Sequence, residues 1–248
     1  MKIGIIIQAR TDSDRFPKKV LELIDDKSVL WHVINQCKQT KLEIIVATTK
    51  RKIDDPIVEI AKKSKVRFFR GSKNDVLDRY YQVAKKFGLE WIIRITADCP
   101  IVDPRESIKV AKLLRSSNID YVALDEKTYP DGLDTEGFTF ESLEIAWKNA
   151  KLKSEREHVS PYIKNNNFKK KTITYKDDLS HFRWTVDYKD DLEFLRAIFS
   201  KLKNKENIHL NQILKILENY PELIKINASH KRNEGYRKSI KNDKIIIN

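Results

Sequence analysis

The chain has 248 residues, 40% of them hydrophobic and 34% charged, which excludes an intrinsically disordered protein and allows one sizeable core. Its longest apolar runs, residues 3–7 and 44–47, are too short for a membrane-spanning helix, which needs ~20 residues. Its two cysteines are too few for a disulfide framework or a cysteine-based zinc site. The net charge of +13 favours an anionic partner without choosing among a nucleotide, an acidic metabolite, a nucleic acid and a membrane surface, and a lysine-rich solvated surface explains it equally well. We expect a soluble, cytoplasmic protein.

Strand and helix patterns alternate through the first half of the chain. Short β-branched or aromatic runs, typical of strands buried on both faces, occur at residues 2–9, 43–49, 66–70, 90–97 and 120–124. Helical patterns lie between them at residues 28–39, 55–63, 74–87 and 104–116, and Asp103 and Pro104 are suited to begin the last helix. This order predicts an α/β fold with a mostly parallel sheet, whose ligand site lies beyond the carboxyl ends of the strands.

The second half of the chain is less regular. A polar loop is expected at residues 125–137, helices at 140–150 and 155–165, a strand pair at 171–175 and 182–186, and helices at 190–203 and 210–219. We expect one domain over residues 1–221. The basic, poorly patterned segment 222–248 is expected to be an arm or a tail.

The loop after the first strand, QARTDSDRFPKKVL at residues 8–21, carries four cations beside two hydroxyl side chains: Arg10, Arg15, Lys18, Lys19, Thr11 and Ser13. Arginine forks and lysine point charges at the end of a buried strand suit a polyphosphate. None of the glycines forms a GxGxxG or GxxxxGK motif, which excludes dinucleotide dehydrogenases and Walker-type NTPases.

Two aspartates follow predicted strands. Asp98 follows the strand at 90–97, and Asp187 directly follows residues 184–186. Asp98 is the best candidate for a metal ligand, whereas either aspartate alone could cap a helix. Cys99 could be a nucleophile, but a buried, inert thiol is the favoured interpretation.

These blocks resemble the cytidylyltransferases that activate acidic eight- or nine-carbon sugars, in which the first strand leads into a pattern like QARxxSxRxPxK. RGSKNDVLDRY at 70–80, RITADCPIVDP at 94–104, YPDGLDTEGF at 129–138, EREHVSPYI at 155–163 and RWTVDYKDDLEF at 183–194 are similar to the spore-coat polysaccharide protein F branch. The resemblance implies a Rossmann-like nucleotidyltransferase (GT-A-like) fold, an α/β/α sandwich, and often a homodimer. It also implies transfer of CMP from CTP to an acidic sugar for surface polysaccharide synthesis, with release of pyrophosphate.

The resemblance also assigns residues to the nucleotide and the metal. It implies a CTP site with Ala9, Arg10, Ser13, Arg15, Lys19, Thr48, Arg70 and Asp98. The catalytic residues that it implies are Arg10, Lys19, Asp98 and Asp187. Asp98 and Asp187 would hold Mg²⁺, which prefers carboxylates together with substrate phosphates. One departure is Lys18, which stands where the acid-sugar synthetases usually carry glycine and which either adds a phosphate ligand or points into solvent.

Acceptor recognition is expected from Arg94, Asp131, Glu136, Glu157 and His158. Capping, subunit contact or, for His158, packing would explain some of these residues equally well. The alternative functions are a nucleotide-sugar glycosyltransferase of related fold and, less favoured, a non-catalytic nucleic-acid-binding protein. The favoured hypothesis has CTP and an acidic sugar as partners, and neither a nucleic acid nor a membrane.

Overall fold

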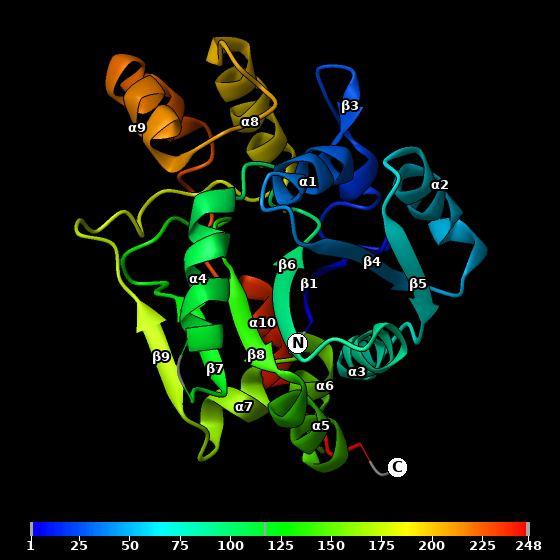
Figure 1. The fold of residues 1–248 in the computed structure, drawn as a ribbon. Helices are drawn as coiled ribbons and strands as arrows, with labels where there is room; N and C mark the ends of the chain where they lie inside the picture. Colours follow the sequence, from blue (N-terminus) through cyan, green and yellow to red (C-terminus); the bar gives the residue numbers. More distant parts are fainter. Residues whose placement is uncertain (1, 117, 247–248) are drawn as a thin grey trace.

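The computed structural model describes residues 2–116 and 118–246 and contains a central seven-stranded sheet (Figure 1). The strand order is β5 (Arg67–Gly71), β4 (Glu43–Thr49), β1 (Ile3–Gln8), β6 (Trp91–Thr96), β8 (Glu136–Thr139), β7 (Tyr121–Leu124) and β9 (Lys170–Ile173). Neighbouring strands are parallel except where β8 meets β6 and β7. The mostly parallel α/β sheet predicted from the sequence is therefore confirmed.

Helices cover both faces of the sheet because its strands are apolar on both sides. In β1, Ile5 and Ile7 belong to one buried cluster, while Ile6 belongs to the other, as the alternation of side chains along a strand requires. The first cluster includes residues of α1 (Val29–Lys38), α2 (Asp55–Lys63), α4 (Pro104–Ser116), α8 (Lys189–Lys201) and α9 (Leu210–Asn219). The second includes residues of α3 (Val76–Phe87), α5 (Phe140–Asn149) and α7 (Pro161–Asn165).

The described chain also contains short elements between these layers. They are η1 (Lys19–Leu21), β2 (Leu23–Ile24), β3 (Lys27–Ser28), η2 (Lys52–Asp54), α6 (Lys153–His158), η3 (Pro221–Ile226) and α10 (Glu234–Lys241). Asp103 accepts hydrogen bonds from the backbone amides of Arg105 and Leu210, both at 2.8 Å. The predicted N-cap therefore also joins the start of α4 to the start of α9.

One loop prediction and one strand prediction are wrong. Residues 136 and 137, expected in a polar loop, belong to β8, because Glu136 and Gly137 pair with β6 and β7 in the reversed direction. Residues 182–186 do not pair with 171–175 as a second strand. They lie against two loops instead: Trp184 N–H donates to the carbonyl of Asp131 (2.6 Å), and Val186 N–H donates to that of Asp98 (2.8 Å).

The helix expected over residues 155–165 is interrupted. It divides into α6 and α7 at Val159, whose φ of 72° lies in the left-handed region. Pro161 begins α7, and a proline inside a continuous helix would remove a hydrogen bond and clash with the preceding turn. Among the described residues, no helix is both long and apolar enough to cross a membrane.

Candidate active site

A cavity of about 1260 Å³ lies where β1 and β6 end. Its lining comes from the loops after these strands, from β7 and β8, and from α6 and α10. Because β8 runs opposite to its neighbours, its first residue, Glu136, lies at the edge where the parallel strands finish. The cavity therefore occupies the position predicted for the ligand of a parallel α/β sheet.

The cavity contains two carboxylates that share one ammonium group. Lys19 Nζ donates to Asp98 Oδ2 and to Asp187 Oδ1, each at 2.6 Å. Burial acts to lower the pKa of Lys19, but the two carboxylates outweigh it and raise this pKa. Burial acts in the opposite direction on the pKa values of Asp98 and Asp187, and Lys19 holds both below their ordinary range. All three groups are therefore charged at neutral pH.

A buried arginine holds Asp187 in place. Arg183 donates to Asp131 Oδ2 (2.6 Å), to Asp187 Oδ2 (3.2 Å) and to both oxygens of Asp191 (2.8 and 3.1 Å). Asp191 also accepts from the backbone amides of Asp187 (2.9 Å) and Tyr188 (3.0 Å). Asp191 thus accepts from the free backbone amides just before α8, and the Asp187 carboxylate is left to pair with Lys19 and Arg15. Burial and Asp134 raise the pKa of Asp131 to about 7.

The loop after β1 is fixed by a buried aspartate. Asp54 Oδ1 accepts from Thr11 N (2.8 Å) and Thr11 Oγ1 (2.7 Å), and Lys18 N donates to the carbonyl of Thr11 (2.7 Å). This arrangement positions Arg15, which forms an ion pair with Asp187 Oδ1 at 2.6 Å. Lys18 is exposed and adopts φ 61°, a left-handed conformation that glycine adopts without steric cost.

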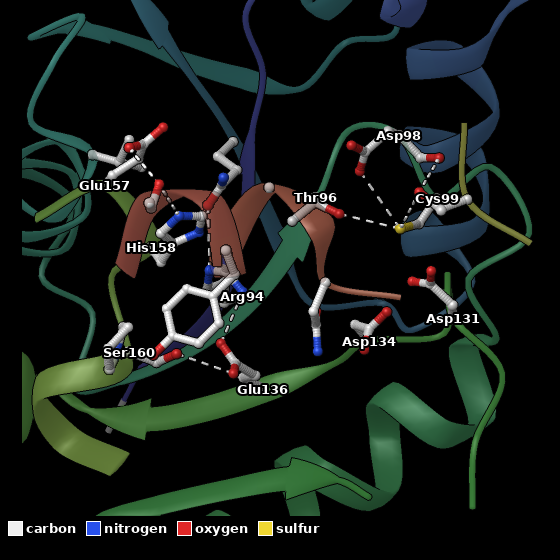
Figure 2. Close-up of a pocket in the computed structure, with 18 of the residues that line it drawn as sticks. Arg94, Thr96, Asp98, Cys99, Asp131, Asp134, Glu136, Glu157, His158 and Ser160 are labelled. Carbon is white, nitrogen blue, oxygen red and sulfur yellow. Dashed lines mark hydrogen bonds and ion pairs between the residues drawn. The ribbon is translucent and has the colours of Figure 1, made fainter. Parts of the chain in front are cut away.

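A second charged group lies at the β8 side of the cavity. Arg94 donates to Glu136 Oε2 (2.8 Å) and to Gln8 Oε1 (3.2 Å), and Glu136 Oε1 accepts from Tyr121 (2.7 Å) and Ser160 (3.0 Å). Glu136 also pairs with Lys164. Burial acts to raise the pKa of Glu136, but Lys164 and Arg94 outweigh it and lower this pKa strongly. Figure 2 shows Arg94, Glu136 and Ser160 together on this side.

The C-terminal segment of the same chain completes the wall of the cavity. We call residues 230–246 the strap. At its start, Arg232 donates to the carbonyls of Glu126 and Tyr129, both at 2.7 Å, and Tyr188 Oη donates to Glu234 (2.6 Å). At its end, Asp243 accepts from Ser154 N (3.0 Å) and Oγ (2.5 Å). Between these anchors α10 packs on α6, as Figure 1 shows.

The family comparison matches this architecture. A cytidylyltransferase family model matches residues 4–232. The chain belongs to the cytidylyltransferase family. It is 39% identical to an uncharacterized protein of Methanocaldococcus jannaschii over 96% of this chain and 98% of that one. It is 27% identical to the spore coat polysaccharide biosynthesis protein SpsF of Bacillus subtilis over 89% of this chain and 95% of that protein.

Two further similarities concern enzymes with a named activity. A 3-deoxy-manno-octulosonate cytidylyltransferase of Rickettsia bellii is 30% identical over 53% of this chain and 55% of that one. The structure of a cytidylyltransferase from Leptospira borgpetersenii superposes with a TM-score of 0.87 at 34% identity, over 90% of this chain and 97% of the other. The nucleotidyltransferase fold expected from the sequence is thus confirmed.

Most of the site residues predicted from the sequence line this cavity. They are Ala9, Arg10, Ser13, Arg15, Lys19, Arg94, Asp98, Asp131, Glu136, Glu157, His158 and Asp187. Thr48 and Arg70 are not among the lining residues. Thr48 is fully buried, and Arg70 donates to the carbonyls of Thr49 (2.8 Å) and Arg51 (2.7 Å). The structure does not bring these two residues to the cavity.

Cys99 does not have the properties of a nucleophile. The residue is 3% exposed, and burial followed by the charge of Asp98 raises the pKa of its thiol well above its usual range. The thiol therefore stays protonated at neutral pH, and a protonated thiol is a weak nucleophile.

Two parts of this site, Arg183 and the strap, were not predicted from the sequence. Arg183 stands in a strand-like run beside Trp184 and Val186, and a cation buried in such a run requires acidic partners, so the block did contain a signal. The strap contained none. The sequence of α10 is short and rich in charged residues, with only Tyr236 and Ile240 as large apolar side chains, and α10 has no buried residue, so it offers little of the pattern that marks a packed helix.

Proposed function

We propose that this chain is a cytidylyltransferase that transfers CMP from CTP to an acidic sugar and releases pyrophosphate. The observation that supports it most directly is the opposition of Asp98 and Asp187 across Lys19, beside Arg15. This arrangement combines acidic and cationic groups at the strand ends where a nucleotide is expected. The acid-sugar acceptor is supported by the relative of Rickettsia bellii, whose name states an octulosonate substrate.

The donor set fits a divalent cation. Asp98 and Asp187 direct oxygens at one common point, and Mg²⁺ in nucleotide enzymes is typically held by one or two carboxylates together with substrate phosphates. Within the described residues no cluster of three or more His, Cys, Asp or Glu residues has metal-binding geometry, so the triphosphate would complete the ligand set. Bound there, Mg²⁺ would neutralise negative charge on the phosphates.

The cations of the loop would act on the same triphosphate. Arg15 and Lys19 now pair with carboxylates, and both can exchange these partners for phosphate oxygens. Arg10 lines the cavity beside them. A hydroxyl oxygen of the acceptor would attack the α-phosphorus of CTP while the bond from that phosphorus to the oxygen that bridges to the β-phosphorus breaks, and the proton of the hydroxyl would pass to water. These side chains would stabilise the charge that develops on the leaving pyrophosphate. This displacement needs no covalent intermediate with the protein.

A pyrophosphate-release assay tests the function. Each nucleoside triphosphate is combined with octulosonic, pseudaminic and legionaminic acids and with phosphonates, with and without Mg²⁺. The proposal expects release that requires CTP, an acid acceptor and Mg²⁺. Release with none of these combinations, or sugar transfer from a nucleotide-sugar donor, would contradict it.

Two isosteric variants test the carboxylates. We expect Asp98→Asn and Asp187→Asn each to lower kcat by at least about 100-fold, because each removes a charge from the proposed metal and phosphate site. Circular dichroism checks that the fold is kept. Asp26→Asn, at an exposed carboxylate paired with Lys27, is the matched control and should retain wild-type turnover. Wild-type kcat in either site variant would refute the assignment.

A further inference from the structure

His158 is connected to Glu157 through a hydroxyl of the strap. His158 Nε2 lies 3.0 Å from Ser239 Oγ, and Ser239 Oγ donates to Glu157 Oε2 at 3.1 Å. Figure 2 shows the dashed lines that lead from the imidazole to the Glu157 carboxylate. The three groups come from two elements, since α6 carries the histidine and the glutamate and α10 carries the serine.

The direction of these hydrogen bonds fixes the tautomer of the imidazole. An ionised carboxylate only accepts hydrogen bonds, and a serine hydroxyl has one proton to donate. Since that proton is directed at Glu157, Ser239 Oγ must accept from His158, which requires a proton on Nε2. In a neutral imidazole Nδ1 is then an acceptor with a free lone pair.

The surroundings keep the imidazole neutral and partly accessible. Burial, despite the opposing charge of Glu157, lowers the pKa of His158 to about 4, and the nearby cations Arg94 and Arg10 act in the same direction as burial. The ring of Tyr236 packs edge-on against the imidazole, with 4.9 Å between centroids. His158 lines the cavity, and no group of the described residues forms a hydrogen bond with its Nδ1.

We propose that Ser239 is a positioning residue that holds His158 in the Nε2–H tautomer, so that Nδ1 accepts a hydrogen bond from a hydroxyl of the acceptor sugar. The inference rests on the proposed function and adds a specificity element to it, one that the strap supplies from the same chain. A hydroxyl is the group that this nitrogen selects, because an ether or carbonyl oxygen at the same place would offer it no proton.

Nitrogen NMR of the full chain with ¹⁵N-labelled histidine tests the tautomer directly. We expect wild-type His158 to show a protonated Nε2 and an unprotonated Nδ1 at pH 7, and Ser239→Ala to show a mixture of tautomers. Addition of 3-deoxy-manno-octulosonate with CMP in place of CTP should move the Nδ1 resonance of the wild type. A wild-type imidazole protonated at Nδ1 would overturn the proposal.

Kinetics separate positioning from a general structural effect. In Ser239→Ala we expect the KM for the acid sugar to rise about fivefold, the value of one modest hydrogen bond, while the KM for CTP stays at the wild-type value. Ser239→Thr keeps the hydroxyl and should restore the acceptor KM. The matched control is Ser200→Ala in α8, because this exposed serine donates only to the carbonyl of Ala197 in its own helix.

The outcomes distinguish this inference from the proposed function. Pyrophosphate release by the wild type, combined with an unchanged acceptor KM in Ser239→Ala, would overturn the inference and leave the function standing. Equal increases in the KM values for acceptor and CTP would also overturn it. Absence of pyrophosphate release with every acid sugar would overturn both.

Discussion

Lys18 has a left-handed backbone conformation, which glycine adopts more easily than lysine. The family resemblance allowed the Lys18 side chain either to bind phosphate or to point into solvent. In the structure Lys18 has φ 61°, and its side chain is exposed and does not line the cavity. The left-handed region costs an L-residue about 1–2 kcal/mol. The lysine at position 18 therefore carries a backbone cost that glycine would not.

Replacing this lysine by glycine should stabilise the protein. Lys18→Gly removes the steric cost and adds about 0.5–1 kcal/mol of chain entropy to be lost on folding, so we expect the free energy of unfolding to rise by about 0.5–1 kcal/mol. Urea denaturation measures it. Lys41, which has φ 59° and is exposed, provides a matched Lys→Gly control with the same expected gain. A KM for CTP raised more than about threefold in Lys18→Gly alone would show that this side chain does bind phosphate.

His158 should make stability depend on pH in a defined window. Its folded-state pKa of about 4 lies below the ordinary value near 6.5, so its stabilising contribution is complete above pH 6.5 and is lost as pH falls toward 4. Between pH 7 and pH 4.5 we expect the wild type to lose about 2 kcal/mol more than His158→Gln.

Urea denaturation at the two pH values measures this difference. The matched control is His181→Gln, which makes the same substitution at an exposed histidine that does not line the cavity. Identical losses in the wild type and His158→Gln would mean that the imidazole takes up a proton as readily in the folded chain as in the unfolded chain.

At the scale of elements, the sequence predicts what hydrophobic periodicity controls. The strands at 43–49 and 90–97 and the helices between them are in place because their apolar residues face two cores. Periodicity failed where other forces decide. Residues 182–186 are held by the ion pairs of Arg183. The helix expected over residues 155–165 is divided at Val159, which has φ 72°, and α7 begins at Pro161.

The same contrast applies to the site. Lys19 and Asp98 were predictable because they lie in the loops after β1 and β6. Asp187 was expected after a strand over residues 182–186, which the structure does not contain, and its place in the site was otherwise implied by the family resemblance. Ser239 and Tyr236 were not predictable, because their places depend on how the strap crosses the cavity, and no local pattern specifies that path. The anchors of the strap join residues that are far apart in the sequence: Ser154 contacts Asp243, His158 contacts Ser239 and Arg232 contacts Glu126, each more than 80 positions away.

Removal of the strap should therefore affect function more than folding. A chain that ends at Ser229 keeps Asn227, which donates to Asp191 at 2.9 Å, and loses a helix that has no buried residue. We expect Tm to fall by less than about 5 °C, which corresponds to roughly 1–2 kcal/mol for a chain of this size, while turnover with the acid sugar falls at least about tenfold. Loss of cooperative unfolding would show instead that the strap is part of the folding unit.

For the molecule as a whole, the net charge of +13 has a kinetic consequence. Long-range attraction of an anionic nucleotide raises the rate of encounter and is screened by salt. At saturating Mg²⁺ we expect kcat/KM for CTP to fall by about tenfold or more between 0.05 and 0.5 M KCl, with kcat unchanged. Sucrose at matched osmolarity serves as the control. A kcat/KM independent of salt would leave the excess charge as a solvated surface without a part in substrate capture.

The homodimer stays a prediction that size-exclusion chromatography would test.

The ammonium group of Lys19, held between Asp98 and Asp187, also balances the charge of the site before a nucleotide binds. Neighbouring carboxylates would repel one another if nothing lay between them, and here a counterion tethered to the backbone removes that repulsion in advance. In this arrangement no dissolved cation is needed to offset the charges of Asp98 and Asp187. In the proposed reaction, Mg²⁺ that arrives bound to CTP would replace the Lys19 ammonium between the two carboxylates. Chelation of Mg²⁺ would then stop turnover without unfolding the protein.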